Sequence, residues 1–312
     1  MKPKFSLTRL ITTVFLFNLL VFFSCAKEAS QNGTPSQQEE QASMVSSESD
    51  GEAEIIFNGI FDDAMGVNDD VGMAGTGVFG RTFLTNTNGG SGMQRLNGCI
   101  TVTITHPSNT VFPARVVIDF GTAGCLGNDL HVRKGKIISE YTNRLIVPGA
   151  IATTTFDGFY IDSIKVEGTY KITNTSSLVT TQLSRQFTVD IIDGKLYKPN
   201  GNYTEWNSHK VITQIEGLLT PDYPRDDIFK IEGSAHGKVK KGSLLVAWES
   251  AIIEPLIKKF FCPWIVKGSI KTTRVNTSAN SAWVAVLDFG NGDCDKKAVI
   301  TINGTAHNIT LH

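Results

Sequence analysis

Alternation of apolar and polar residues is the feature that most limits how this chain can fold. It is clearest in FYIDSIKVEGTYKITNT, which begins at residue 159. Large apolar residues recur there at even positions: Tyr160, Ile164, Val166, Tyr170 and Ile172. A strand with one apolar and one polar face belongs in an antiparallel sheet that is buried on one side and wet on the other.

The same alternation recurs in RQFTVDIIDGK, IFKIEGSAHGKV, AWVAVLDF and KAVITI. Turn signals separate these segments: Asn303-Gly304 is a two-residue hairpin signal, and residues 199–202 read Pro-Asn-Gly-Asn. No convincing helical pattern of about ten residues intervenes, which argues against βαβ units. We therefore predict an all-β antiparallel meander of roughly a dozen strands over residues 97–312, arranged as a curved sheet, a sandwich or a partly closed barrel.

A short motif occurs twice, in RVVIDFGTAGC ending at Cys125 and in WVAVLDFGNGDC ending at Cys294. A kinase interpretation of DFG fails, because the chain has no Gly-rich phosphate loop, no HRD-like loop and no VAIK lysine. We predict no bound nucleotide, and interpret the motif as a strand end followed by a turn. Each Asp would then face away from the buried Phe and accept hydrogen bonds from the turn backbone.

The cysteines fit this architecture. If Cys99 faces Cys125, the midpoint of the hairpin falls in the turn-like HPSNTVFP, and if Cys262 faces Cys294 it falls in NTSANS. Both pairs then lie at the open ends of hairpins, where Cα atoms come within disulfide range. We predict the disulfides Cys99–Cys125 and Cys262–Cys294.

The N-terminus predicts export. Three basic residues precede the apolar run LITTVFLFNLLVFF, and Ser24-Cys25 follows it. This junction resembles the lipobox of bacterial lipoproteins, which implies removal of residues 1–24 and lipidation of Cys25. Plain secretion is the alternative. The four remaining cysteines are an even number, as expected for two disulfides in an oxidising compartment.

The next segments are expected to contribute little to the core. Residues 25–53 are rich in Ser, Gln and Glu, and we predict a lipidated, disordered tether. Residues 54–65 carry one apolar face and predict a short surface helix packed on an edge of the sheet. A Gly/Asn-rich loop completes the segment 54–96.

Charge and composition exclude some partners. The formal charge of the full chain is −1, and it becomes −4 when residues 1–24 are removed, because they carry three positive charges and no negative ones. A mildly acidic chain lacks the electrostatic footprint of nucleic-acid binding.

Two candidate sites remain. Oxygen ligands gather in DFGNGDCDK, which suggests calcium held by Asp288, Asn291, Asp293 and Asp295, the alternative being a polar turn beside a disulfide. Aromatic side chains gather at the 199–202 turn, which suggests a sugar- or protein-binding surface formed by Tyr197, Tyr203 and Trp206. The alternative there is cross-strand packing that covers the sheet.

The runs VIDFGTAGC, RKGKI, KVEGT and VLDFGNGDCDKKA resemble a group of Bacteroidota lipoproteins with repeated DFG…Cys motifs, over about residues 97–311. The resemblance implies a cell-envelope location and brings no activity, so no functional residue is carried over. We therefore expect an outer-membrane, lipid-anchored, non-catalytic binding or structural module whose partner is a glycan or an envelope protein. The alternative is an exported polysaccharide-active hydrolase with unidentified carboxylates.

Overall fold

The computed structural model describes residues 34–65, 94–96, 99–108, 110–127, 131–177, 185–219, 226–260, 262–275, 281 and 283–311. Residues 39–312 form one compact unit, and residues 34–38 are described only by their own contacts. The predictions for residues 1–24, for Cys25 and for the loop at 66–93 lie outside the described residues.

The predicted antiparallel meander is confirmed: fourteen strands pair in one sheet in chain order, and β4 pairs with β5 beside this path. The sheet is not closed. The strands are β1 (Gln94–Leu96), β2 (Ile100–Thr105), β3 (Ala114–Asp119), β4 (Cys125–Leu126), β5 (Val132–Tyr141), β6 (Ile151–Ile161), β7 (Ile164–Asn174), β8 (Arg185–Tyr197), β9 (Tyr203–Glu216), β10 (Ile228–Lys241), β11 (Leu244–Lys259), β12 (Ile265–Arg274), β13 (Ala285–Asn291), β14 (Lys297–Ile302) and β15 (Thr305–Thr310).

The predicted faces are observed in β7, where Val166, Tyr170 and Ile172 are buried on one face. They are not observed for Tyr160 in β6: Phe159 is the buried residue there, and Tyr160 pairs with Lys165 on the opposite face. The turn and the bulges between the two strands change which residues face the core.

The predicted two-residue turn is also observed. Asn303-Gly304 forms the β14–β15 turn with φ values of 50° and 75°, which is the left-handed pair that a tight hairpin requires.

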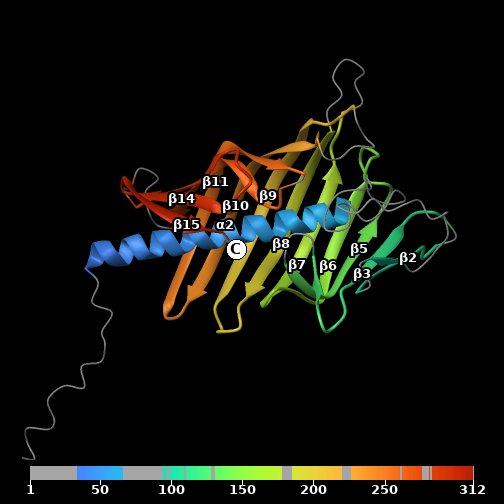
Figure 1. Cartoon of the computed structure of the whole chain (residues 1–312), viewed down its shortest axis with the longest axis horizontal. Helices are drawn as coiled ribbons and strands as arrows, with labels where there is room; N and C mark the ends of the chain where they lie inside the picture. Colours follow the sequence, from blue (N-terminus) through green and yellow to red (C-terminus); the bar gives the residue numbers. More distant parts are fainter. Residues whose placement is uncertain are drawn as a thin grey trace, which may run out of the picture. The chain divides into compact units, whose positions relative to one another are not determined.

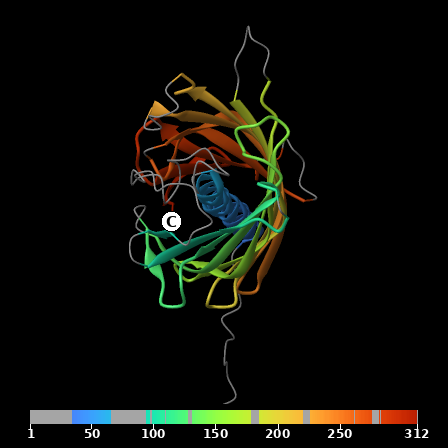
Figure 2. The same cartoon turned by 90° about the vertical axis from the view of Figure 1, so that its right-hand side faces the viewer.

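The sheet curves strongly, as Figure 2 shows by a view along the helix that it surrounds. Irregularities in the strand register produce this curvature, since a β-bulge bends its strand and increases the local twist. At several of them only glycine fits, as Gly168 and Gly233 illustrate. Gly168 has φ 119° and lies against the next strand, where a Cβ would come within 2.8 Å of the Asp193 carbonyl oxygen. Gly233 has φ 139° and would bring a Cβ within 2.2 Å of the His209 carbonyl oxygen.

A single long helix, α2 (Pro35–Met65), precedes the sheet. Its N-terminus is a capping box: the backbone N–H of Thr34 donates to Gln37 Oε1 (2.9 Å), and the backbone N–H of Gln37 donates to Thr34 Oγ1 (3.4 Å). Pro35 follows at the first helical position, where its missing N–H costs nothing. The prediction of a disordered tether is therefore wrong for residues 35–53, which are helical.

The helix lies across the concave face of the sheet (Figures 1 and 2), so the prediction of a short surface helix at the sheet edge is also wrong. Near its C-terminal end, Tyr141 Oη in β5 donates to the Ala64 carbonyl at 2.8 Å. Phe57 stacks on Tyr170 in β7 and on Trp206 in β9. Further toward the N-terminus, Gly51 packs against β13, so closely that a Cβ would lie 2.6 Å from Leu287 Cδ2.

The core of the protein is therefore the interface between α2 and the concave face. Ile56, Phe57, Ile60 and Phe61 of the helix are all at most 6 % exposed. The sheet contributes its largest side chains to the same core, namely Tyr141, Tyr170, Phe187, Trp206, Phe229 and Trp248. Burial of four large apolar helix side chains contributes about 6–12 kcal/mol to folding, from about 1.5–3 kcal/mol each.

Candidate functional site

Both predicted disulfides are present. Cys99 bonds to Cys125 and Cys262 bonds to Cys294, each with a Cα–Cα distance of 5.7 Å. Cys99 precedes β2 and Cys125 follows β3, while Cys262 precedes β12 and Cys294 follows β13. The bonds therefore close the open ends of two antiparallel strand pairs, one near each edge of the sheet.

The repeated Asp has the same role in both copies. Asp119 Oδ1 accepts a hydrogen bond from the backbone N–H of Gly121, and Asp288 Oδ1 accepts one from Gly290, both at 2.8 Å. The following Phe120 is buried, as is Phe289 in the second copy. The DFG motif is thus a strand end and a turn.

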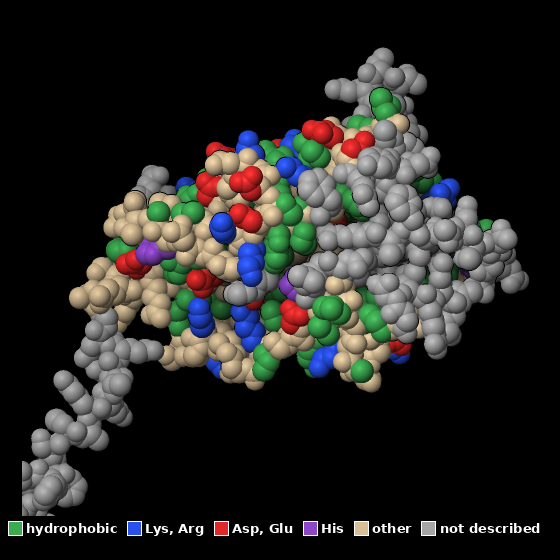
Figure 3. Space-filling model, in the orientation of Figure 1, with side chains coloured by type: hydrophobic (Ala, Val, Ile, Leu, Met, Phe, Trp, Pro, Cys, Tyr) green, Lys and Arg blue, Asp and Glu red, His purple; other side chains and the backbone are tan. Residues whose placement is uncertain are grey.

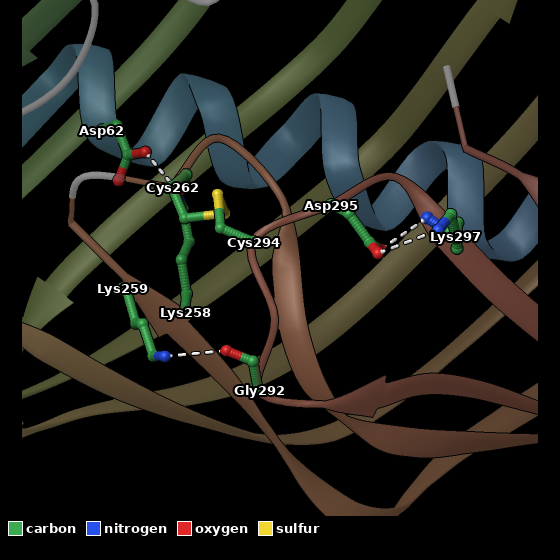
Figure 4. The surroundings of a disulfide bond; sticks show 8 residues. All are labelled: Asp62, Lys258, Lys259, Cys262, Gly292, Cys294, Asp295 and Lys297. Atoms are coloured by element: carbon green, nitrogen blue, oxygen red, sulfur yellow. Dashed lines mark hydrogen bonds and ion pairs between the residues drawn. A yellow bond between two sulfur atoms is a disulfide. The ribbon is translucent and has the colours of Figure 1, made fainter.

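The three carboxylates among the four candidate calcium ligands form no metal-binding group. Asp288 Oδ1 accepts a hydrogen bond from the backbone N–H of Gly290 in the turn that follows it. Asp295 Oδ1 accepts one from the backbone N–H of Lys297 at 2.9 Å, and its other carboxylate oxygen lies 3.8 Å from Lys297 Nζ (Figure 4). Among the described residues, no group of three or more His, Cys, Asp and Glu side chains could hold a metal ion. The geometry gives the calcium hypothesis for Asp288, Asn291, Asp293 and Asp295 no support.

The predicted aromatic cluster is divided between the two faces of β9. Trp206 is 1 % exposed and points toward α2, where its Nε1 donates to Asp50 Oδ1 at 2.8 Å. Tyr197 and Tyr203 lie on the opposite face as a directly opposed cross-strand pair, with ring centroids 6.3 Å apart. The interpretation of Trp206 as part of the same surface as the tyrosines is therefore wrong.

The two tyrosines belong to a larger row that the sequence did not reveal. One residue from each of seven consecutive strands, β5 to β11, lies in register on the outer face of the sheet, away from α2. The row reads Lys134, Tyr160, Lys165, Tyr197, Tyr203, Lys240 and Leu245. We call this row the Tyr–Lys ladder. With about 4.8 Å between neighbouring strands, it is about 29 Å long.

The ladder is held in place by its own side-chain contacts. Lys134 Nζ lies 4.4 Å from the centroid of the Tyr160 ring, a cation–π contact. Lys165 Nζ pairs with Glu167 at 2.6 Å, and this hydrogen bond raises the pKa of Lys165 above its ordinary value. Lys240 is exposed, and its side chain makes no hydrogen bond or ion pair with the described residues.

The next row on the same face carries four residues of alternating charge, followed by an alanine: Glu167, Lys195, Glu205, Lys238 and Ala247. Glu205 lies between two lysines, 3.9 Å from Lys195 Nζ and 2.9 Å from Lys238 Nζ. Together the two rows hold five lysines and two glutamates, so this end of the outer face has an excess of positive charge.

A cleft of about 480 Å³ lies beside the β8–β9 and β10–β11 turns, where Tyr203 and Lys240 of the ladder line it. Two ion pairs connect its hairpins to α2: Lys198 with Glu52 at 2.8 Å, and Lys241 with Glu48 at 3.3 Å. The edge strand β15 forms another wall. The cleft therefore lies between these turns and α2, and its lysines Lys198 and Lys241 are paired with the glutamates that also line it.

A second concavity of about 820 Å³ lies further along the outer face, over β8 to β12. Its lining includes Asp190, His209, His236, Glu249 and Lys271. His209 Nδ1 and Asp190 Oδ1 are 2.6 Å apart. The surface is hollow here because small residues stand between the larger side chains, such as Ser234 opposite His209.

The buried face of α2 carries charges that the sheet neutralises. Glu54 pairs with Lys210 at 2.8 Å, and both side chains are at most 5 % exposed. Asp50 Oδ1 accepts hydrogen bonds from Trp206 and Trp248 Nε1 at 2.8 and 3.0 Å.

The same pattern continues toward the C-terminal end of α2, where Lys258 pairs with Asp62 at 2.7 Å beside the Cys262–Cys294 bond (Figure 4). Acidic and basic side chains are also interspersed on the surface visible in Figure 3. The contact between helix and sheet therefore depends on paired charges as well as on apolar packing.

One carboxyl group has an unusual environment. Asp227 is 5 % exposed, and burial raises its pKa to about 7, with the neighbouring Asp226 adding to the effect. Gln214 Nε2 donates to Asp227 Oδ1 at 2.7 Å, and Arg185 Nη1 donates to Gln214 Oε1 at 2.7 Å. Asp227 lines neither of the two clefts described above.

The raised pKa of Asp227 predicts a stability change with pH. A carboxyl whose pKa is higher in the folded state binds a proton more tightly there, so the stability it contributes is complete below pH 4 and is lost as the pH rises through 7. Asp227→Asn should equal the wild type near pH 4.5 and exceed it near pH 8, by on the order of 2 kcal/mol. Melting temperatures across this range test the difference, with the exposed Asp157→Asn as control. A constant difference between variant and wild type would contradict the prediction.

Comparison with protein-family models, with curated proteins and with solved structures finds no match for the chain. In the part of the chain that the structure describes, no helix has both the length and the apolar character needed to cross a membrane.

Proposed function

We propose that this protein is a lipid-anchored, non-catalytic module of the cell envelope. In this proposal the sheet clamps α2, so that the anchor at Cys25 holds the domain near the outer membrane, and the outer face binds an envelope partner. The observation that carries the proposal is the position of α2: it fills the concave face, which leaves the outer face and the hairpin ends for ligands.

The length of the spacer supports a position near the membrane. Only about ten residues separate Cys25 from the start of α2, and these can span at most about 35 Å when fully extended. A disordered tether reaching to residue 53 would have allowed much more freedom. Because α2 is held by the sheet, the flexible spacer between the anchor and the folded domain is shortened to about ten residues.

A test of the clamp uses two chains, each with one inserted protease site. Cleavage between Cys25 and Thr34 should release the whole domain from membranes. Cleavage between Met65 and Gln94 should leave the sheet bound to membranes, because α2 remains held by Phe57, Glu54 and Asp50 without a covalent link. The matched control adds Lys210→Met to the second chain, which should make the sheet easier to release. Complete release from the second chain alone would refute the clamp.

The lipid anchor has its own test. Cys25→Ser should move the protein from the membrane fraction to the soluble fraction without changing its melting temperature. Continued membrane association of this variant would refute lipid anchoring while leaving the clamp intact.

A polysaccharide-active hydrolase is the second candidate, and one observation favours it. Asp227 has the raised pKa expected of a catalytic acid, and Asp226 lies beside it. Release of reducing ends from a polysaccharide, lost in Asp227→Asn, would support this alternative. The absence of turnover together with the pH-dependent stability described above would assign Asp227 a structural role.

A further inference from the structure

We propose that the Tyr–Lys ladder and the cleft beside Tyr203 and Lys240 bind an acidic polysaccharide, a hydroxyl-rich chain that carries carboxylate or phosphate groups. The inference rests on the proposed binding role of the outer face and names the ligand class for it.

The side chains of the ladder match this chemistry. Aromatic rings such as those of Tyr197 and Tyr203 offer flat apolar surfaces to sugar rings and phenol groups to their hydroxyls. The lysines between and beside them offer ammonium groups, and Lys240 has no partner among the described residues. Five lysines against two glutamates over the two rows favour an anionic ligand.

The shape of the ladder favours a linear ligand. The row crosses seven strands over about 29 Å, in the direction in which the sheet curves around α2. A flexible polymer can follow this convex path and enter the cleft at Tyr203. A flat bilayer would touch only part of a convex row, so the geometry favours a polymer over a membrane surface.

The ladder also lies on rigid elements. Its side chains stand on paired strands, and contacts such as Lys134 with Tyr160 and Lys165 with Glu167 fix neighbouring members. A site on strands loses less conformational freedom on binding than one on loops.

The experiment uses the full chain carrying Cys25→Ser, so that the lipid anchor contributes nothing. Polygalacturonate is the acidic probe, dextran is the neutral polymer, and vesicles of phosphatidylethanolamine and phosphatidylglycerol represent a membrane. We expect binding to polygalacturonate that weakens with salt, because screening acts on exposed charges. Dextran and vesicles should bind at least about tenfold more weakly, which is the discrimination expected from one or two charged contacts.

Variants separate the two kinds of contact. Tyr197→Ala with Tyr203→Ala should weaken polygalacturonate binding about tenfold, whereas the corresponding Phe variants should retain it, because they keep the ring faces. Lys240→Gln should weaken binding several-fold and reduce the salt dependence. Lys297→Gln, which removes an exposed lysine from β14, is the control and should have no effect.

Three results would overturn the proposal. One is no binding to polygalacturonate by a folded chain. Another is binding that the ladder variants leave unchanged. The third is tighter binding to vesicles than to the polymer, with loss in Lys240→Gln, which would assign the ladder to the membrane surface. None of these results affects the protease-release test, so the clamp and the ligand can fail independently.

Discussion

Deletion of residues 35–65 is expected to abolish cooperative unfolding of the sheet. The deletion removes Ile56, Phe57, Ile60 and Phe61, whose burial contributes about 6–12 kcal/mol. That amount is comparable to the whole stability of an ordinary domain, about 5–15 kcal/mol. The concave face would also expose Trp206 and other large rings to water. Circular dichroism and a thermal melt measure the result.

A graded series makes this prediction specific. Deletion of residues 26–33 should leave the melting temperature unchanged, since it retains Thr34 and the whole helix. Deletion of residues 26–53 should destabilise strongly, because it removes Asp50 from Trp206 and Trp248 and Gly51 from Leu287. A synthetic peptide covering residues 34–65, added to the chain that lacks them, should restore the melt. A cooperative, wild-type-like transition in the chain without residues 35–65 would contradict the role assigned to α2.

The sheet could be predicted from the sequence because its signals are local. Each signal defines a strand or a hairpin within about thirty residues. These signals are the alternation in residues 159–175, the Asn303-Gly304 turn and the turn between Cys99 and Cys125. Neighbouring strands in the meander are also neighbours in the sequence. The two disulfides follow from the same local logic.

The helix could not be predicted in the same way, because its partners are distant. The segment 35–53 has the composition of a disordered chain, and it is ordered by contacts such as Asp50 with Trp206 and Ser43 with the Trp283 carbonyl, which span 156 and 240 residues. One local signal was available: Thr34 and Gln37 match the capping-box motif, and Pro35 stands at the first helical position. Small side chains then let the helix approach the sheet closely, as Gly51 does with Leu287.

The candidate site shows the same division. Period two alone separates Tyr203 from Trp206, since an odd spacing places two residues on opposite faces of a strand. The Tyr–Lys ladder, however, depends on the register of seven strands. Bulges such as those at Gly168 and Gly233 shift that register, and the size of the shift cannot be read from the sequence.

Lys210→Met is expected to lower the free energy of unfolding by about 3–5 kcal/mol, the typical cost of removing one partner from a buried ion pair. Lys210 and Glu54 are 5 % and 2 % exposed at the side chain, so neither charge can turn to water when the other is lost. The variant would also lose the contact of Lys210 Nζ with the Trp206 ring, at 5.7 Å from its centroid. Urea unfolding of the wild type and the variant measures the difference.

The double variant Lys210→Met with Glu54→Met discriminates between a lost charge and lost packing. Replacing both partners by apolar side chains leaves no buried charge, so the double variant should be more stable than Lys210→Met and lie within about 1–2 kcal/mol of the wild type. Its remaining deficit comes from Asn58, whose Nδ2 donates to Glu54 Oε1 at 3.2 Å and would lose that acceptor. The half-exposed pair of Lys230 and Glu232, 2.7 Å apart, is the control, and Lys230→Met should cost less than about 1 kcal/mol. If the double variant were as unstable as the sum of its single variants, the Glu54–Lys210 charges would be acting independently, and pairing across the helix–sheet interface would not explain why the sheet accepts so polar a helix.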